Sequence, residues 1–251
     1  MSSARLIAIV VALVLCASVG TSHAQSLTPD LELETGWYAR IKTSMGRIVI
    51  RLLPAQAPQS VAHFAAYANG ELEWMDPITG ELRNDPLFDG VLVQKALAGQ
   101  RFELGTRRKD GMSFPWRYVP EEGTGPVNFL RDYVVGMTQT DSGRIAAHQF
   151  FITSAPQPFL TPGYPCFGEV VHGREVIDMI TKVRTYENND RPIEEVVIEE
   201  VRAFTVGNAG ELATPEPFWP VQQHLGMREG LRGRKLNPAR APKGDEADQK
   251  L

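Results

Sequence analysis

The sequence contains little cysteine. Of its 251 residues only Cys16 and Cys166 are cysteines. Cys16 lies in an N-terminal segment that we expect to be removed, so the remaining chain would hold one cysteine and no intrachain disulfide. We expect Cys166, between Pro165 and Phe167, to serve as a small buried apolar residue rather than as a reactive thiol.

The sequence also lacks a strong charge of either sign and the motifs of common catalytic centres. A formal net charge of -4 argues against a general polyanion binder, so no nucleic-acid partner is expected. No nucleophile elbow or phosphate-binding glycine loop is present, and the histidines do not have the spacing of a metal site. We therefore expect neither metal nor cofactor, and we interpret His63 and His148 as structural.

The N-terminus has the pattern of a secretory signal. Arg5 precedes an apolar run from Leu6 to Cys16, and Ser22-His23-Ala24 fits the cleavage rule. Because the run is well short of the roughly 20 residues of a spanning helix, we expect cleavage after Ala24 and no membrane span afterwards. The predicted location is extracytoplasmic, in the periplasm or the medium. Lipidation of Cys16 is an alternative that the bulky Leu15 disfavours.

Composition divides the chain into four parts. A signal peptide at 1–24 is followed by a polar lead at 25–36, a globular block at 37–205 and a tail at 206–251 that is rich in proline, glycine and charge. The tail composition predicts disorder. With 43% apolar residues the globular block can bury a core of its own, and we expect a monomer.

Residue patterns in the block predict many short strands and two helices. Alternation predicts a hairpin at 39–53, further strands at 91–93, 133–138, 149–153 and 166–170, and a closing strand at 196–204. Pro58 begins a helix that runs to Gly70, and a second helix follows Gly173. Turn signals predict a surface loop at 71–87. The predicted fold is mainly β, a closed barrel capped by two α-helices.

The most distinctive stretch begins at Gln149-Phe150-Phe151-Ile152 and continues through Phe159-Leu160 to Phe167-Gly168-Glu169-Val170. It combines a buried strand, one amide and several aromatic rings, which suits a site that holds a proline ring. Ala57-Pro58, Phe88-Asp89-Gly90 and Val135-Gly136-Met137 complete an ordered set. From Ala39 to Phe204 the chain resembles a bacterial secreted cyclophilin, a peptidyl-prolyl cis/trans isomerase.

The resemblance implies an eight-stranded antiparallel barrel with two capping helices and a substrate groove on its outer surface. It assigns the proline pocket to Phe151, Met137 and Leu160, with Phe159 at a position often held by tryptophan or phenylalanine. Gln149 matches an amide that binds substrate backbone. Thr138, Gln139 and Thr140 match a stretch that pairs with the residue before proline, and Tyr164 matches a histidine or tyrosine position. We expect Phe150 to be ordinary core.

The opposite wall of the expected groove departs from the family. Val93-Gln94-Lys95 places a lysine where cyclophilins carry the catalytic arginine, so Lys95 keeps the charge and loses the planar fork. The stretch from Gln100 to Thr106 loses two pocket apolars and has Glu103 in place of a glutamine. We expect Glu103 to pair with Lys95, either drawing its charge from substrate or as a solvated surface pair. Phe102 should point away from the groove.

The resemblance implies peptidyl-prolyl isomerase activity, and the chemistry of the peptide bond agrees with it. The rotation barrier of that bond is about 18 to 20 kcal/mol and arises from resonance, so an apolar pocket and a cation near the imide suffice to lower it. The sequence predicts an isomerase that acts on proline-containing segments in extracytoplasmic folding, with activity weakened at Lys95. The alternative is a catalytically impaired module that binds such segments. A purely structural barrel is a third possibility.

Overall fold

The structure is a computed structural model that describes residues 31–105, 117–123, 125–140 and 143–215. The predicted signal segment, Cys16, Thr106 and the tail beyond residue 215 lie outside the described residues. None of the described helices is long and apolar enough to cross a bilayer.

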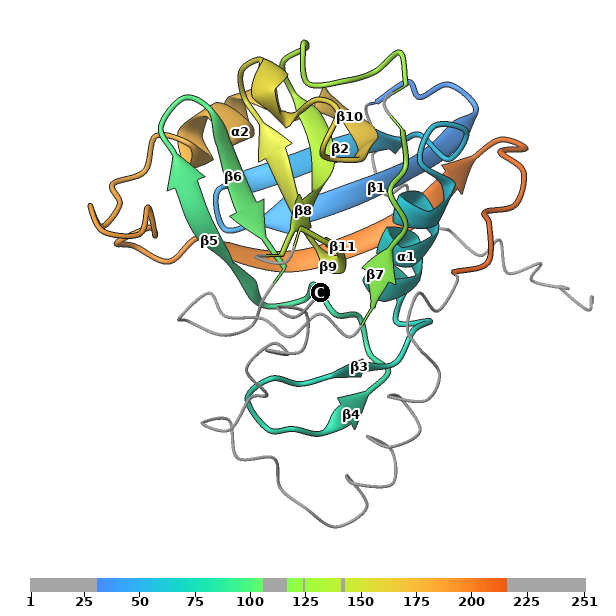
Figure 1. The fold of residues 1–251 in the computed structure, drawn as a ribbon, viewed down its shortest axis with the longest axis horizontal. Coiled ribbons are helices and arrows are strands. Elements are labelled where there is room, and N and C mark those ends of the chain that lie inside the picture. Colours follow the sequence, from blue (N-terminus) through green and yellow to red (C-terminus); the bar gives the residue numbers. More distant parts are fainter. Residues whose placement is uncertain (1–30, 106–116, 124, 141–142, 216–251) are drawn as a thin grey trace, which may run out of the picture. The chain divides into compact units, whose positions relative to one another are not determined.

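Eight antiparallel strands close into a barrel (Figure 1). Their order is β6-β5-β11-β1-β2-β10-β8-β9, and pairing of β6 with β9 closes the ring. The short strand β7 (Tyr118–Val119) pairs with β9 outside this ring. The predicted fold class is confirmed. The barrel strands are β1 (Gly36–Thr43), β2 (Gly46–Leu52), β5 (Val91–Leu97), β6 (Arg101–Leu104), β8 (Val134–Gln139), β9 (Ile145–Thr153), β10 (Cys166–His172) and β11 (Val197–Val206).

The first hairpin shows why these residues form strands. Gly46 has φ 140°, a conformation that favours glycine, and the Thr43 hydroxyl accepts a bond of 3.0 Å from the Met45 amide. Alternation then points Ile48 and Ile50 into the barrel, where they are fully buried. The hairpin predicted at 39–53 is confirmed.

Helix α1 (Pro58–Asn69) begins at the predicted proline and ends at Gly70, whose φ is 73°. No side chain at the N-cap closes its first turn. Instead the Glu122 carboxylate accepts bonds from the amides of Gln59 and Ser60, at 2.6 and 2.9 Å. This replaces the missing cap.

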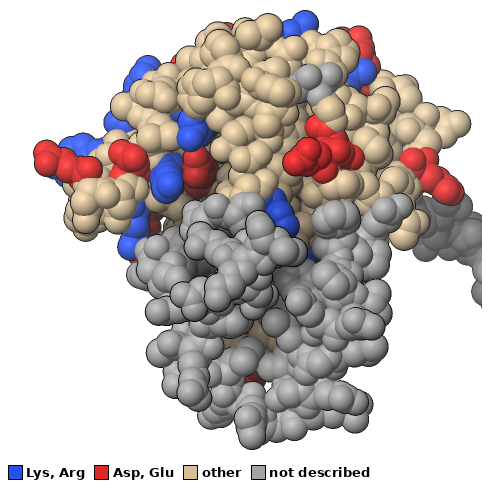
Figure 2. Space-filling view, viewed as in Figure 1, with Lys and Arg blue, Asp and Glu red and all other residues tan. Residues whose placement is uncertain are grey.

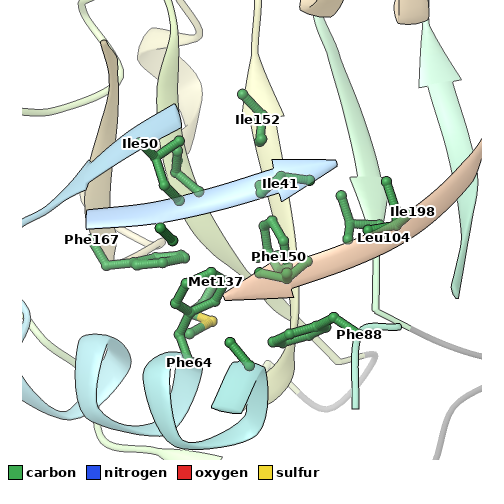
Figure 3. Packing of buried hydrophobic residues seen from close by; sticks show 14 of the residues in the cluster. Ile41, Ile50, Phe64, Phe88, Leu104, Met137, Phe150, Ile152, Phe167 and Ile198 are labelled. Atoms are coloured by element: carbon green, nitrogen blue, oxygen red, sulfur yellow. The ribbon is translucent and has the colours of Figure 1, made fainter. Parts of the chain in front are cut away.

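The barrel core is aromatic at the α1 end. The Phe64 ring lies 5.4 Å from that of Phe88 and 5.2 Å from those of Phe150 and Phe167 (Figure 3). The prediction that Phe150 is core is confirmed, and His63 on the same helix is fully buried. Helix α2 (Arg174–Ile180) contributes Ile177 and Ile180 to the same core. The single-turn helix η1 (Pro158–Leu160) lies outside the barrel strands.

The segment predicted as a surface loop at 71–87 contains a small hairpin, so that prediction is wrong for part of it. Strand β3 (Trp74–Met75) pairs with β4 (Leu82–Arg83). The Arg83 guanidinium lies 5.1 Å from the Trp74 ring centroid, and Asp76 accepts a 2.8 Å bond from the Ile78 amide in the turn. These side-chain contacts stabilise two-residue strands that carry no periodic signal.

The described part of the predicted tail, residues 206–215, begins with the last residue of β11 and then contacts the domain. The Trp37 indole donates a 3.0 Å bond to the Gly210 carbonyl, and the Gln59 amide donates a 3.2 Å bond to the Thr214 carbonyl. Leu212 packs against the barrel core. The rest of the predicted tail lies outside the described residues.

Candidate functional site

A row of facing residues crosses four strand interfaces of the barrel wall. It runs from Lys95 on β5 through Glu103 on β6, Phe151 on β9 and Gly136 on β8 to Cys166 on β10. Residues paired across strands share a face, and side chains alternate along a strand. The neighbours Phe102 and Phe150 therefore point inward and are fully buried, as predicted for both.

The middle of this row carries a second apolar cluster, separate from the barrel core. We call it the outer cluster: Phe129, Val134, Phe151, Leu160 and Cys166, with Val127 and Tyr164 packed at its margin. The Phe151 ring lies 5.4 Å from Phe129 and 5.8 Å from Tyr164, which meets it nearly edge-on at 81°. Only 1% of Phe151 is exposed.

Gly136 makes room for the outer cluster. A Cβ atom at this position would lie 2.5 Å from Cζ of Phe151 and 2.6 Å from Cζ of Phe129. Such distances are well inside van der Waals contact, so the two rings occupy the space that a side chain on β8 would need. Gly136, in the Val-Gly-Met motif of the sequence, thus leaves the space in which these two rings pack.

The outer cluster brings together Phe151, Leu160 and Tyr164 from the predicted set. It does not include Met137, which faces Phe150 across β8 and β9 and lies inside the barrel (Figure 3). The expected pocket position of Met137 is therefore wrong, because it follows the outward-facing Gly136 and alternation turns it inward. Phe159 is 69% exposed and stands apart from the cluster.

Polar side chains flank the outer cluster at the end of β8. The Thr138 hydroxyl donates a 3.3 Å bond to Oε1 of Gln149, so these two predicted residues lie together. Gln139 donates from Nε2 to the Gly163 carbonyl, which ties β8 to the loop carrying Tyr164. The Thr140 hydroxyl donates to the Arg144 carbonyl at 3.2 Å. Within the described chain, the Gln149 amide nitrogen donates no hydrogen bond.

The expected pair between Lys95 and Glu103 does not form, although the two are Cα partners. Glu103 instead accepts a bond from Nε of Arg101 at 3.0 Å. Lys95 is exposed and has no ion-pair partner among the described residues. A guanidinium two residues away on the same face reaches the carboxylate with a directed N–H bond, which an ammonium on a flexible stem does not match.

Arg101 is the residue that the sequence reasoning missed. Its Cζ lies 5.8 Å from the centroid of the Phe151 ring, and its terminal nitrogen donates to Oε1 of Gln157 at 3.4 Å. Alternation was the available signal, because Arg101 and Glu103 must share a face of β6. In Figure 2 side chains of both charges stand next to one another beside β5 and β6, while uncharged surface covers the region of β8 and β10.

Burial sets the protonation of two groups near the row. It lowers the pKa of His148 to about 4, so this imidazole is neutral at pH 7. It raises the pKa of Cys166 to about 12, so the thiol stays protonated. Cys166 is a fully buried member of the outer cluster, which confirms its predicted apolar role.

Comparison with known proteins decides the family. Residues 38–203 match the family model of the cyclophilin type peptidyl-prolyl cis-trans isomerases. The chain belongs to the cyclophilin family. This cyclophilin is 37% identical over 166 residues to peptidyl-prolyl cis-trans isomerase B of Streptomyces anulatus. The aligned region covers 65% of this chain and 94% of that protein. The chain is also 29% identical over 165 residues to peptidyl-prolyl cis-trans isomerase A of Mycobacterium tuberculosis, covering 65% and 90%.

A solved structure supports the fold of this cyclophilin. A cyclophilin type isomerase of Cryptosporidium parvum, crystallised in the presence of the dipeptide Ala-Pro, matches with a TM-score of 0.55 at 21% identity. The match covers 66% of this chain and 97% of that one.

Proposed function

We propose that this cyclophilin isomerises X-Pro bonds of extracytoplasmic polypeptides at the outer cluster, and that it does so slowly. Peptidyl-prolyl isomerase activity is the property of its family. The observation that supports the site is the row from Lys95 to Cys166, which places Lys95, Glu103 and Phe151 on one face of the barrel.

Isomerisation requires few functional groups from these residues. Uncatalysed X-Pro isomerisation takes tens to hundreds of seconds, and its barrier falls when the imide nitrogen loses conjugation. An apolar surface around Phe151 and Leu160 would hold the proline ring, and the Gln149 amide would bind the flanking backbone. A cation close to the imide would then stabilise the twisted bond more than the planar one. No bond is made or broken.

The proposal of reduced activity rests on the position of Lys95. Neighbouring strands lie about 5 Å apart, so the Lys95 backbone is about 10 Å from that of Phe151, with β6 between them. Lys95 is exposed, and a solvated ammonium is a poorly fixed donor. Loss of one preorganised donor costs about a hundredfold or more in rate.

The extracytoplasmic part of the proposal rests on the sequence from Arg5 to Ala24. Expression of the full chain in a bacterial host, followed by fractionation and N-terminal sequencing, tests it. The expected mature chain begins at Gln25. A full-length chain that stays in the cytoplasm would contradict this part alone.

The activity is tested by measuring cis/trans exchange of a short Ala-Pro peptide by NMR, with purified residues 25–251. The Lys95→Arg and Lys95→Ala variants are measured in parallel. We expect acceleration by the wild type and a higher rate with Lys95→Arg, because arginine restores the planar fork. Saturable binding without acceleration would reject the isomerase and support the second candidate, a binding module.

One observation bears on both candidates. Phe151 is almost fully covered, partly by the Arg101 guanidinium above its ring, so the surface offered to proline is restricted. A peptide that neither binds nor isomerises would reject both candidates.

A further inference from the structure

The outer cluster has a fixed cation, and it is not Lys95. Three contacts hold the Arg101 guanidinium: the Glu103 carboxylate at 3.0 Å, the Gln157 amide oxygen at 3.4 Å and the Phe151 ring at 5.8 Å. Only 17% of the Arg101 side chain is exposed. Its charge therefore occupies one place, whereas Lys95 extends into solvent without an ion-pair partner among the described residues.

A ligand that packs on the face of Phe151 nearest β6 meets Arg101. The guanidinium lies over the ring on which a proline would pack, and Phe129 and Tyr164 occupy other sides of that ring. A proline ring can settle beside the guanidinium or displace it along the face of β6. In both cases the substrate's backbone comes within reach of its N–H groups.

The remaining hydrogen-bond capacity of Arg101 suits this contact. The two contacts to Glu103 and Gln157 use one N–H each, and a guanidinium carries more donors than these. A donor that is already oriented costs no reorganisation when charge develops on the substrate. Its planar fork can serve two acceptors together, such as the imide nitrogen and a neighbouring carbonyl, which an ammonium cannot do in the same way.

We propose that Arg101 is the main catalytic cation of this cyclophilin, with Glu103 as its positioning residue and Lys95 as a weaker, poorly fixed donor. The proposal rests on the isomerase function proposed above. It places the main catalytic charge on β6 instead of β5. The charge that the family's pattern places on one strand is thereby supplied from the neighbouring strand.

Arg101→Met and Lys95→Met test the proposal, because each removes a charge and keeps a flexible apolar chain. Arg40→Met is the matched control: Arg40 on β1 is 15% exposed and pairs with Glu200 at 2.6 Å, so it resembles Arg101 in burial and pairing. NMR exchange with the Ala-Pro peptide gives kcat/KM, peptide titration gives Kd, and urea unfolding gives the stability of each variant.

We expect Arg101→Met to lower kcat/KM about a hundredfold, Lys95→Met to lower it less, and Arg40→Met to leave it unchanged at a similar loss of stability. Arg101→Lys should recover part of the rate. Glu103→Gln keeps an oxygen that accepts the Arg101 Nε–H, so it should retain most of the rate, whereas Glu103→Leu should lower kcat more than it weakens peptide binding.

Three results would overturn the assignment. One is a greater loss with Lys95→Met than with Arg101→Met. Another is an Arg101→Met rate equal to that of Arg40→Met, and the third is a faster Arg101→Met enzyme, which would make Arg101 a cover on Phe151. An inactive wild type would instead reject the proposed function, so the two failures are distinguishable.

Discussion

Replacement of Gly136 by alanine tests the packing of the outer cluster. The added methyl group would lie 2.5 Å from Phe151 and 2.6 Å from Phe129. Carbon atoms pack favourably at about 3.5 to 4.0 Å, so each ring has to withdraw by about 1 Å. Both rings are buried, at 1% and 0% exposure, and neither can move without disturbing its neighbours.

Overpacking of this kind costs about 1 to 3 kcal/mol of stability. The backbone at Gly136 does not have a positive φ, so the steric term decides the result. Displacement of the Phe151 ring should also weaken binding of a proline peptide, since this ring is part of the surface on which we propose that the proline ring packs. We expect a loss of at least 1 kcal/mol together with weaker binding.

Urea unfolding and peptide titration measure both effects. Gly123→Ala is the control, because a Cβ there meets nothing within 4 Å and its φ is not positive. That substitution should be neutral or slightly stabilising. If Gly136→Ala were as stable as Gly123→Ala, the two rings would not be packed against β8 as described, and the reasoning would fail.

Two further predictions follow from burial. The pKa of His148 is about 4 when folded and about 6.5 when unfolded, so the unfolded chain binds the proton first. The free energy of unfolding should therefore decrease by on the order of 3 kcal/mol as the pH falls from 6.5 towards 4. Urea unfolding of the wild type and of His148→Gln over this pH range measures the decrease. An equal decrease in the two proteins would contradict the prediction. Burial raises the pKa of Cys166 to about 12, so native protein at pH 8 should not be alkylated at Cys166 while urea-unfolded protein is. Mass spectrometry of the Cys166 peptide reads this out, and rapid labelling of the native chain would refute it.

Alternation in the sequence predicted much of the barrel wall. It placed Phe102 and Phe150 inside, as the structure does. Alternation would also have placed Met137 inside the barrel. The expected pocket position came instead from a match to the family's motifs, which gives the order of residues along the chain and not the face of the strand on which a side chain lies. Gly136 faces outward, so its neighbour Met137 turns inward.

The choice of ion-pair partner was beyond the sequence. Lys95 and Arg101 both lie close to Glu103, and the resemblance pointed to Lys95 because it stands at the position of the family's arginine. The structure favours the arginine, because its reach along β6 and its N–H geometry match the carboxylate. Strands β3 and β4 were missed for a related reason, since pairs of residues show no periodicity and depend on side-chain contacts such as that of Trp74 with Arg83.

The bonds from Trp37 to Gly210 and from Gln59 to Thr214 have a practical consequence. They determine where the polypeptide leaves the barrel: beside the first turn of α1, some residues after β11 has ended. Anything joined after Thr214 is therefore anchored to the helix and not to the last strand. Shortening the chain to residue 206 would remove this anchor and uncover the core residues beneath Leu212, so a useful boundary for the domain lies after Thr214.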